Sequence, residues 1–269
     1  LQNGPYLRIL VAEDNAVNQE IARDTLEAAG HAVDIVANGL EAVGAVQSFP
    51  YDIVLMDVHM PEMDGPTATG KIRALPGDIS GIPIIALTAD AMVGDREKFL
   101  AAGMNDYVAK PFDLQQLLSS IAHCMGQTLP YDEPAPSVHA GRGSDAPADT
   151  GLSLTTIDPF IVGRPDLWKR IVAIYLKDTP TSLDALEQAL SDGDPVAIHL
   201  AAHTIKSASA NIGAVRLSNL CRQLEAAAGE ARLDTAAALI TEILSEFDVV
   251  SAALLDDGTG EALAERSTA

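Results

Sequence analysis

The first half of the chain alternates short apolar runs with longer amphipathic stretches. The apolar runs are rich in Val and Ile, as buried parallel strands are, and they lie at 8–12, 33–36, 52–56, 83–87 and 106–109. Helical periodicity fills the intervals at 15–29, 39–48, 66–74, 94–102 and 113–124. Alternation at this spacing predicts an α/β fold, a doubly wound five-stranded parallel sheet with helices on both faces.

The second half shows no strand-like alternation and is predicted to be all-helical. Its helical patterns run over 165–177, 181–191, 195–211, 214–228 and 233–255, with turn signals between them. The apolar positions of these stretches fall on one face each, which favours antiparallel helices around a single core. Cys221 lies within one such face and is expected to be a buried thiol.

A stretch rich in proline and glycine separates the two halves. Residues 127–151 contain four prolines and three glycines and almost no periodic apolar positions, which is typical of a flexible linker. A coil of this length spans on the order of 25 to 30 Å, which lets two small domains touch. We therefore expect an α/β domain at 1–126, the linker at 127–151, a helical domain at 152–257 and a disordered tail at 258–269.

Charge and composition exclude several functions. The net charge of −21 divides into −10 for residues 1–126, −3 for 127–151, −7 for 152–257 and −1 for the tail. Since no part is basic, we expect no nucleic-acid partner. The two cysteines form no CxxC motif, so we expect a reduced, cytoplasmic protein. The sequence shows no apolar run long enough to span a membrane and no leader, so we expect this fragment of a longer protein to make no membrane contact itself.

Polar residues gather where the predicted strands end. Glu13 and Asp14 follow the first strand, Asp57 ends the third, Thr88 follows the fourth and Lys110 follows the fifth. The carboxyl ends of parallel strands meet at one edge of a doubly wound sheet, where such folds bind ligands. Three carboxylates at this edge repel one another unless a hard cation neutralises them, so the sequence predicts a Mg²⁺ site.

Four short motifs carry a family resemblance across nearly all of residues 7–125. They are Glu13-Asp14, Asp57-Val58-His59-Met60-Pro61-Glu62-Met63-Asp64-Gly65, Leu87-Thr88-Ala89 and Tyr107-Val108-Ala109-Lys110-Pro111. In order and spacing they resemble a response-regulator receiver domain. The resemblance implies that Asp57 is the phosphoacceptor. It also implies that Mg²⁺ is held by Asp14, Asp57 and the backbone carbonyl of His59, with Glu13 reaching the ion through water.

The same resemblance assigns roles to three further residues. Lys110 would pair with the phosphoryl oxygens, Thr88 would hydrogen-bond to them, and Tyr107 would swing inward in response. A rival covalent-aspartate class, the dehalogenase-type phosphatases, needs an acid-base Asp two residues after the nucleophile. His59 occupies that position, so this rival lacks its proton donor.

One helical stretch of the second half carries a candidate partner for Asp57. An apolar stripe from Ile198 to Ile212 leaves His203, Lys206 and Ser207 on the opposite face, where we expect His203 to be exposed. The run Ala202-His203-Thr204-Ile205-Lys206-Ser207-Ala208-Ser209-Ala210-Asn211-Ile212-Gly213 resembles a histidine phosphotransfer (HPt) domain, a four-helix bundle. Ser207 stands where that family usually has Gly, and no general base or nucleotide loop is predicted beside His203.

The resemblance implies that His203 is a phosphoacceptor with Lys206 as a counter-charge. An imidazole nitrogen can hold phosphate as a phosphoramidate. Two plainer interpretations stay open at this point: His203 as a solvated surface residue, and His199 with His203 as a zinc pair. A metalloprotease helix would require Glu at position 200, where Leu200 stands.

Together the two resemblances imply phosphorelay signal transduction within the carboxyl-terminal part of a hybrid sensor histidine kinase. Phosphate would reach Asp57 from a kinase transmitter domain, pass to His203 by docking within one chain, and leave for a separate response regulator. The chain shows no ATP site of its own, and its parent would be membrane-anchored. A second hypothesis makes the receiver a phosphorylation-controlled brake or docking module, while the HPt domain exchanges phosphate with another receiver. A DNA-binding output is disfavoured by the acidic second domain.

Overall fold

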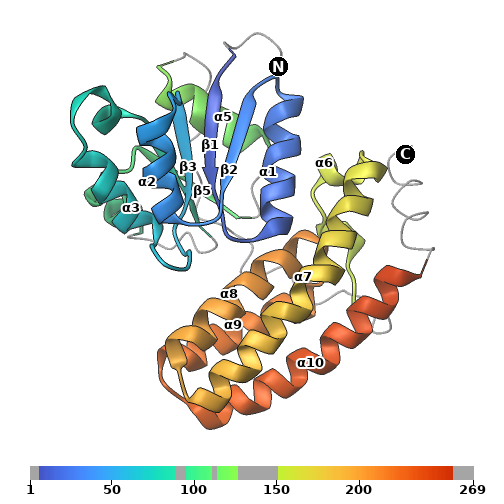
Figure 1. Ribbon diagram of the computed structural model, residues 1–269. Helices are drawn as coiled ribbons and strands as arrows, with labels where there is room; N and C mark the ends of the chain where they lie inside the picture. Colours follow the sequence, from blue (N-terminus) through green and yellow to red (C-terminus); the bar gives the residue numbers. More distant parts are fainter. Residues whose placement is uncertain (1–5, 89–94, 111–113, 127–150, 257–269) are drawn as a thin grey trace. The chain divides into compact units, whose positions relative to one another are not determined.

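The computed structural model describes residues 6–88, 95–110, 114–126 and 151–256 (Figure 1). The chain divides into two compact units, one α/β and one helical, and each is described by itself. The predicted linker lies outside the described residues except for Gly151, and the predicted tail lies outside them entirely.

The α/β unit is built on five parallel strands in the order β2-β1-β3-β4-β5. Its elements are β1 (Arg8–Ala12), α1 (Ala16–Ala28), β2 (Ala32–Val36), α2 (Gly39–Ser48), β3 (Ile53–Asp57), α3 (Gly65–Arg73), β4 (Ile84–Thr88), α4 (Asp95–Ala101), β5 (Asp106–Ala109) and α5 (Leu114–Cys124). A 3₁₀ turn, η1 (Gly77–Gly81), precedes β4. The prediction of a doubly wound five-stranded parallel sheet is confirmed.

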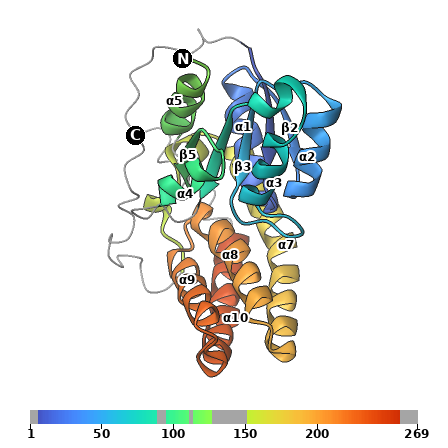
Figure 2. The same ribbon diagram turned by 90° about the vertical axis from the view of Figure 1, so that its left-hand side faces the viewer.

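Burial on both faces of the sheet explains why these strands are apolar throughout. Every residue of β3 and β4 is buried, and Figures 1 and 2 show α2 and α3 on one side of the sheet and α1 on the other. Side-chain caps fix where two of the helices begin. Asn38 accepts from the N–H of Glu41 at α2, and Asp64 accepts from the N–H of Thr67 at α3.

The helical unit is a bundle of four long helices preceded by two short turns of helix. Its elements are η3 (Leu154–Thr156), α6 (Pro159–Val162), α7 (Pro165–Asp192), α8 (Pro195–Asn211), α9 (Val215–Gly229) and α10 (Leu233–Leu255). Helix α8 packs against α7 and α9, and α10 closes the bundle against the same two helices. Gly213, between α8 and α9, has φ +77°, and a Cβ there would lie 2.6 Å from the Ser153 carbonyl oxygen. Only glycine fits this turn without strain.

One predicted break in the helical unit is wrong. The sequence predicted separate helices at 165–177 and 181–191, but α7 runs through Pro180 without interruption. Proline in a helix interior costs about 3 kcal/mol because it removes a hydrogen bond and crowds the preceding turn. Residues on both sides of Pro180 bury one continuous apolar stripe, which includes Tyr175 and Leu186, and this burial outweighs the cost.

Candidate functional site

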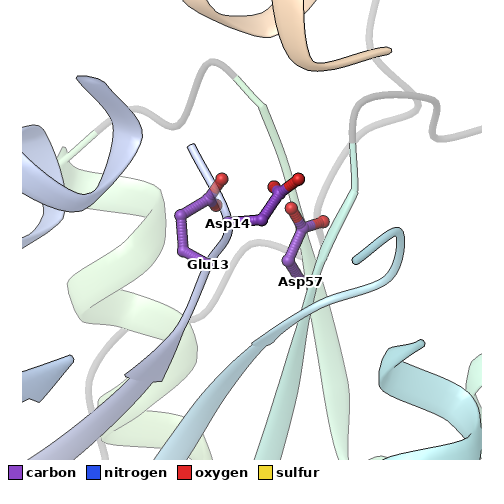
Figure 3. Close-up of side chains that lie close together, drawn as sticks. All are labelled: Glu13, Asp14 and Asp57. Atoms are coloured by element: carbon purple, nitrogen blue, oxygen red, sulfur yellow. The ribbon is translucent and has the colours of Figure 1, made fainter. Parts of the chain in front are cut away.

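Three carboxylates meet at the carboxyl edge of the sheet (Figure 3). Glu13 and Asp14 directly follow β1, and Asp57 is the last residue of β3. Strands β1 and β3 are neighbours with Ala12 paired to Met56, so their ends bring these side chains together. One carboxylate oxygen from each residue lies within 4.8 Å of the other two.

Lys110 balances part of this negative charge. Its Nζ lies 2.6 Å from Asp57 Oδ2 and 2.6 Å from Glu13 Oε2, and all three side chains are buried. Burial by itself would lower the pKa of Lys110, but the charges of Asp57 and Glu13 outweigh that effect and raise the pKa above its usual value. The ammonium therefore stays charged at neutral pH.

Thr88 and Tyr107 lie on the two strands beyond Asp57. Thr88 is the last residue of β4 rather than the first residue after it, and its backbone carbonyl accepts from the Lys110 N–H at 2.6 Å. Tyr107 lies on β5, where its ring packs against Phe99 of α4 with 6.2 Å between ring centroids. The structure thus places Thr88 at the same sheet edge as Asp57 and buries the Tyr107 ring.

The turn after Asp57 is tightly constrained. A Cβ at Gly65 would lie 2.2 Å from the Asp57 carbonyl oxygen, and the Gly65 N–H donates to the Val58 carbonyl. The His59 N–H faces Asp57 Oδ1 at 3.3 Å. Glu62 in the same turn has φ +62°, a left-handed backbone conformation that residues other than glycine rarely adopt. The loop therefore needs a residue without a side chain where α3 begins.

The carboxylate donors fit a hard divalent cation. Glu13, Asp14 and Asp57 offer oxygen ligands only, and Mg²⁺ prefers oxygen ligands from a small number of carboxylates. Among the described residues, no other group of three or more His, Cys, Asp or Glu residues is arranged closely enough to hold a metal. The alternative interpretation of His199 and His203 as a zinc pair thus lacks a third ligand among the described residues.

The second candidate site lies in the helical unit, on facing turns of α8 and α9. His203, Lys206 and Ser207 lie on α8, and Glu225 lies on α9. Glu225 Oε1 lies 2.7 Å from His203 Nδ1, and Glu225 Oε2 lies 2.6 Å from Lys206 Nζ. His199, one turn before His203, packs its ring against the His203 ring at 6.5 Å between centroids.

Within the helical unit, Glu225 contacts both His203 and Lys206. Helix α9 lies against this part of α8 and presents the Glu225 carboxylate to both residues. Burial by itself would raise the pKa of Glu225, but the hydrogen bond from His203 and the charge of Lys206 prevail and lower it. Glu225 is therefore ionised at neutral pH.

Glu225 is the residue of this site that sequence reasoning missed. It directly follows Leu224 at the edge of the apolar stripe on α9, where a charged residue gives no sign of its partner. A buried carboxylate on the helix that packs against His203 would have indicated this contact. The periodicity of each helix taken separately does not show which faces of α8 and α9 pack together.

Two family models match the chain. The response regulator receiver domain matches residues 9–122, and the Hpt domain matches residues 170–253. These ranges contain the carboxylate cluster with Lys110 and the His203 site, respectively. The chain is a receiver domain followed by an Hpt domain, and this pair of domains supports phosphorelay signalling.

Two curated relatives that match the chain across both regions are named as kinases. The sensor histidine kinase GacS of Pseudomonas protegens is 32% identical over 225 residues, which cover 81% of this chain and 24% of GacS. The histidine-protein kinase BarA of Escherichia coli strain K12 is 29% identical over 249 residues, covering 91% of this chain and 26% of BarA. The chain thus spans about a quarter of the length of these relatives.

Among solved structures, the receiver domain of sensor histidine kinase PA1611 from Pseudomonas aeruginosa PAO1 is 44% identical. The match covers 46% of this chain and 100% of that domain with a TM-score of 0.43, and that crystal contains a coordinated magnesium ion. In the described part of this chain, none of the helices is long and apolar enough to cross a membrane.

Proposed function

We propose that Asp57 and His203 are the two phosphoacceptors of a phosphorelay, with phosphate passing from Asp57 to His203 and then to a separate response regulator. The observation that carries this proposal is the Asp57 carboxylate at the sheet edge, 2.6 Å from the Lys110 ammonium and beside two further carboxylates. A carboxylate with this concentration of charge around it is suited to accept a phosphoryl group.

The chemistry at Asp57 needs an acceptor oxygen and positive charge on the moving group. A carboxylate oxygen of Asp57 forms the bond to phosphorus as the bond between phosphorus and the donor breaks. Lys110 offers a fixed positive charge to the phosphoryl oxygens, and the Thr88 hydroxyl donates to one of them. We assign Tyr107 as the side chain that repacks when Asp57 is phosphorylated.

Glu13, Asp14 and Asp57, with the backbone carbonyl of His59, would hold Mg²⁺. When bound, the ion supplies positive charge that offsets the negative charge of the phosphoryl group. The single positive charge of Lys110 cannot balance the negative charges of three carboxylates and a phosphoryl group. This imbalance supports a requirement for Mg²⁺.

The helical unit contributes a nucleophile to the transfer rather than the means of activating phosphate. Within its described residues, 151–256, no group of acidic side chains is arranged to hold a metal. His203 takes the phosphoryl group from the acyl phosphate on Asp57, and Ser207 is the small residue one turn away. The receiver domain that docks there brings Lys110 and the cation.

We further propose that these domains belong to a hybrid sensor histidine kinase, as their likeness to GacS and BarA suggests. Phosphate would come from a transmitter domain of the same or another kinase, and the two domains would act in the cytoplasm.

Burial raises the pKa of the Cys124 thiol to about 12, so this free cysteine stays protonated and unreactive in the cytoplasm.

Labelling with a small phosphodonor tests the proposal. Acetyl phosphate with Mg²⁺ should label Asp57 and then His203, the second label being acid-labile and base-stable. His203→Gln should abolish only the second label, Asp57→Asn should abolish both, and the control His123→Gln, at an exposed position of α5, should abolish neither. Labelling of His203 by acetyl phosphate in Asp57→Asn would contradict the assigned order of transfer.

A further inference from the structure

A second histidine lies one turn before His203 on α8. His199 and His203 are four residues apart, so their side chains share one face of the helix. The two rings are nearly parallel, with 26° between the ring planes and 6.5 Å between the ring centroids. A group that is bound to the His203 ring therefore lies close to the His199 ring.

Both rings turn the same nitrogen toward the same residue of α9. His203 Nδ1 meets the Glu225 carboxylate at 2.7 Å, and His199 Nδ1 faces the Glu225 backbone carbonyl at 3.3 Å. Because the rings are nearly parallel and both Nδ1 atoms face Glu225, the two Nε2 atoms point away from Glu225 on the same side. A phosphoryl group on the Nε2 atom of His203 would thus stand beside the Nε2 edge of His199.

His199 can present either of two charge states to that phosphoryl group near neutral pH. A backbone carbonyl only accepts hydrogen bonds, so the Nδ1 atom of His199 carries a proton in both states. In the neutral ring Nε2 has a lone pair, which repels phosphoryl oxygens. In the protonated ring Nε2–H donates a hydrogen bond and the ring is positively charged. Only the protonated ring therefore attracts phosphate on His203.

The charged groups around this part of α8 come from α8 itself and from the helices packed against it, α7 and α9. The Glu225 carboxylate on α9 contacts two basic side chains, those of His203 and Lys206. The other charged residues of the nearby turns are exposed, and they are Asp184, Glu187, Asp192, Asp194, Arg222 and Glu230. Lys206 follows His203 on α8 and His199 precedes it, so the two basic side chains approach the His203 ring from opposite directions along the helix.

We propose that His199 is a pH-dependent anion-binding partner of His203: when protonated, its Nε2–H holds the phosphoryl group on His203, so the Hpt domain retains phosphate better as the pH falls from about 8 to about 6. This role of His199 rests on the proposed function of His203. The proton on His199 Nε2 comes from solvent, and no covalent bond to phosphorus forms or breaks at His199.

The ring spacing sets the size of the effect. Phosphorylation adds about one to two negative charges beside His199, depending on whether the His203 ring becomes a cation. At 6.5 Å and the dielectric constant of bulk water, this charge favours the protonated form of His199 by about three- to tenfold. Coupling between two binding events is reciprocal, so protonation of His199 should favour phosphate on His203 by the same factor.

The first test measures the charge of His199 directly by ¹⁵N NMR. His203 of the Asp57→Asn chain is loaded with phosphate from a phosphorylated His203→Gln chain, which is then removed, and His199→Gln assigns the ring signals. Loading should raise the ratio of protonated to neutral His199 at pH 7 by about three- to tenfold. An unchanged ratio in the loaded chain would overturn the proposed role of His199.

The second test measures how phosphate divides between His203 of the Asp57→Asn chain and Asp57 of the His203→Gln chain at pH 6 and pH 8. Adding His199→Gln to the Asp57→Asn chain should lower the share on His203 about three- to tenfold at pH 6 and little at pH 8. His199→Lys, which is charged at both pH values, should match native His199 at pH 6 and exceed it at pH 8. His123→Gln, at an exposed position of α5, should match native His199 at both.

The outcomes separate failure of this role from failure of the proposed function. Circular dichroism shows whether each variant folds. If folded His199→Gln divides phosphate as native His199 does at both pH values, then His199 does not hold the phosphoryl group. If His203 of the Asp57→Asn chain never takes phosphate from the phosphorylated chain, the proposed function fails, and the role of His199 fails with it.

Discussion

Replacing Lys110 by methionine removes the ammonium group that contacts Glu13 and Asp57 of the carboxylate cluster. Methionine keeps most of the length and apolar stem of lysine, so the change is chiefly one of charge. The substitution leaves Glu13 and Asp57 buried without the ammonium that lies 2.6 Å from each. We expect the α/β unit to be destabilised through repulsion and unmet hydrogen bonds.

The size of the effect follows from these distances and the burial. At 2.6 Å and an effective dielectric constant of about 20, each ion pair contributes about 6 kcal/mol before desolvation is counted. Desolvation offsets most of this attraction, and removal of one partner from a buried pair costs about 3 to 5 kcal/mol. We therefore predict a loss of about 3 to 5 kcal/mol in the free energy of unfolding when a chelator is present.

Magnesium should recover part of that loss. A ligand at about 100 times its Kd stabilises the folded state by about 2.7 kcal/mol. Without Lys110 the carboxylates carry more uncompensated charge, so the variant should gain more stability from Mg²⁺ than the wild type does. Denaturant unfolding with and without Mg²⁺ measures both gains.

The chain offers an internal reference for this assay. Trp168, the single tryptophan, lies buried on α7, so its fluorescence reports the helical unit while circular dichroism reports both units. Lys71→Met, at an exposed position of α3, is the matched control and should change neither signal. Unchanged stability of Lys110→Met in chelator, or a Mg²⁺ gain no larger than that of the wild type, would contradict this prediction.

Three further predictions concern Gly65, Pro180 and Glu225. Gly65→Ala should cost about 1 to 3 kcal/mol and reduce labelling of Asp57, since the new Cβ would clash with the Asp57 carbonyl. Gly70→Ala, with open space in the same helix, should do neither. Pro180→Ala should stabilise the helical unit by up to about 3 kcal/mol in Trp168 fluorescence unfolding, whereas Pro195→Ala at the first turn of α8 should change it little. Because the folded state lowers the pKa of Glu225 below its ordinary 4.5, its carboxylate stabilises the fold above that pH and less as the pH falls through the folded pKa. The stability difference between wild type and Glu225→Gln should therefore shrink from about pH 7 to about pH 3, and a constant difference would contradict it.

The sheet and the carboxylate edge could be predicted because they depend on local signals. The Val- and Ile-rich runs mark buried strands, and parallel strands bring Asp14, Asp57 and Lys110 to one edge whatever the details of packing. The predicted boundaries moved by about one residue, so Thr88 ends β4 instead of following it. Such shifts are expected, since strand ends depend on pairing with a neighbour that one segment does not reveal.

The helical unit was harder to predict because its details depend on contacts between helices. Pro180 predicted a helix end because proline disfavours a helix interior. Burial of apolar residues on both sides of Pro180 nevertheless stabilises α7 as one continuous helix. The carboxylate beside His203 was not predicted because periodicity describes one helix at a time. The partner helix α9 and its Glu225 enter only with the packing of the bundle.

A complementation experiment tests whether phosphate passes from Asp57 to His203. Receiver phosphate is formed on His203→Gln, excess donor is removed, and Asp57→Asn is added as the acceptor chain at several concentrations. We predict that phosphate leaves Asp57 of the first chain and appears on His203 of the second, and that intact wild type transfers phosphate at a rate independent of protein concentration. If His203 stays unlabelled in both arrangements while Asp57 is phosphorylated, the two sites do not form a relay.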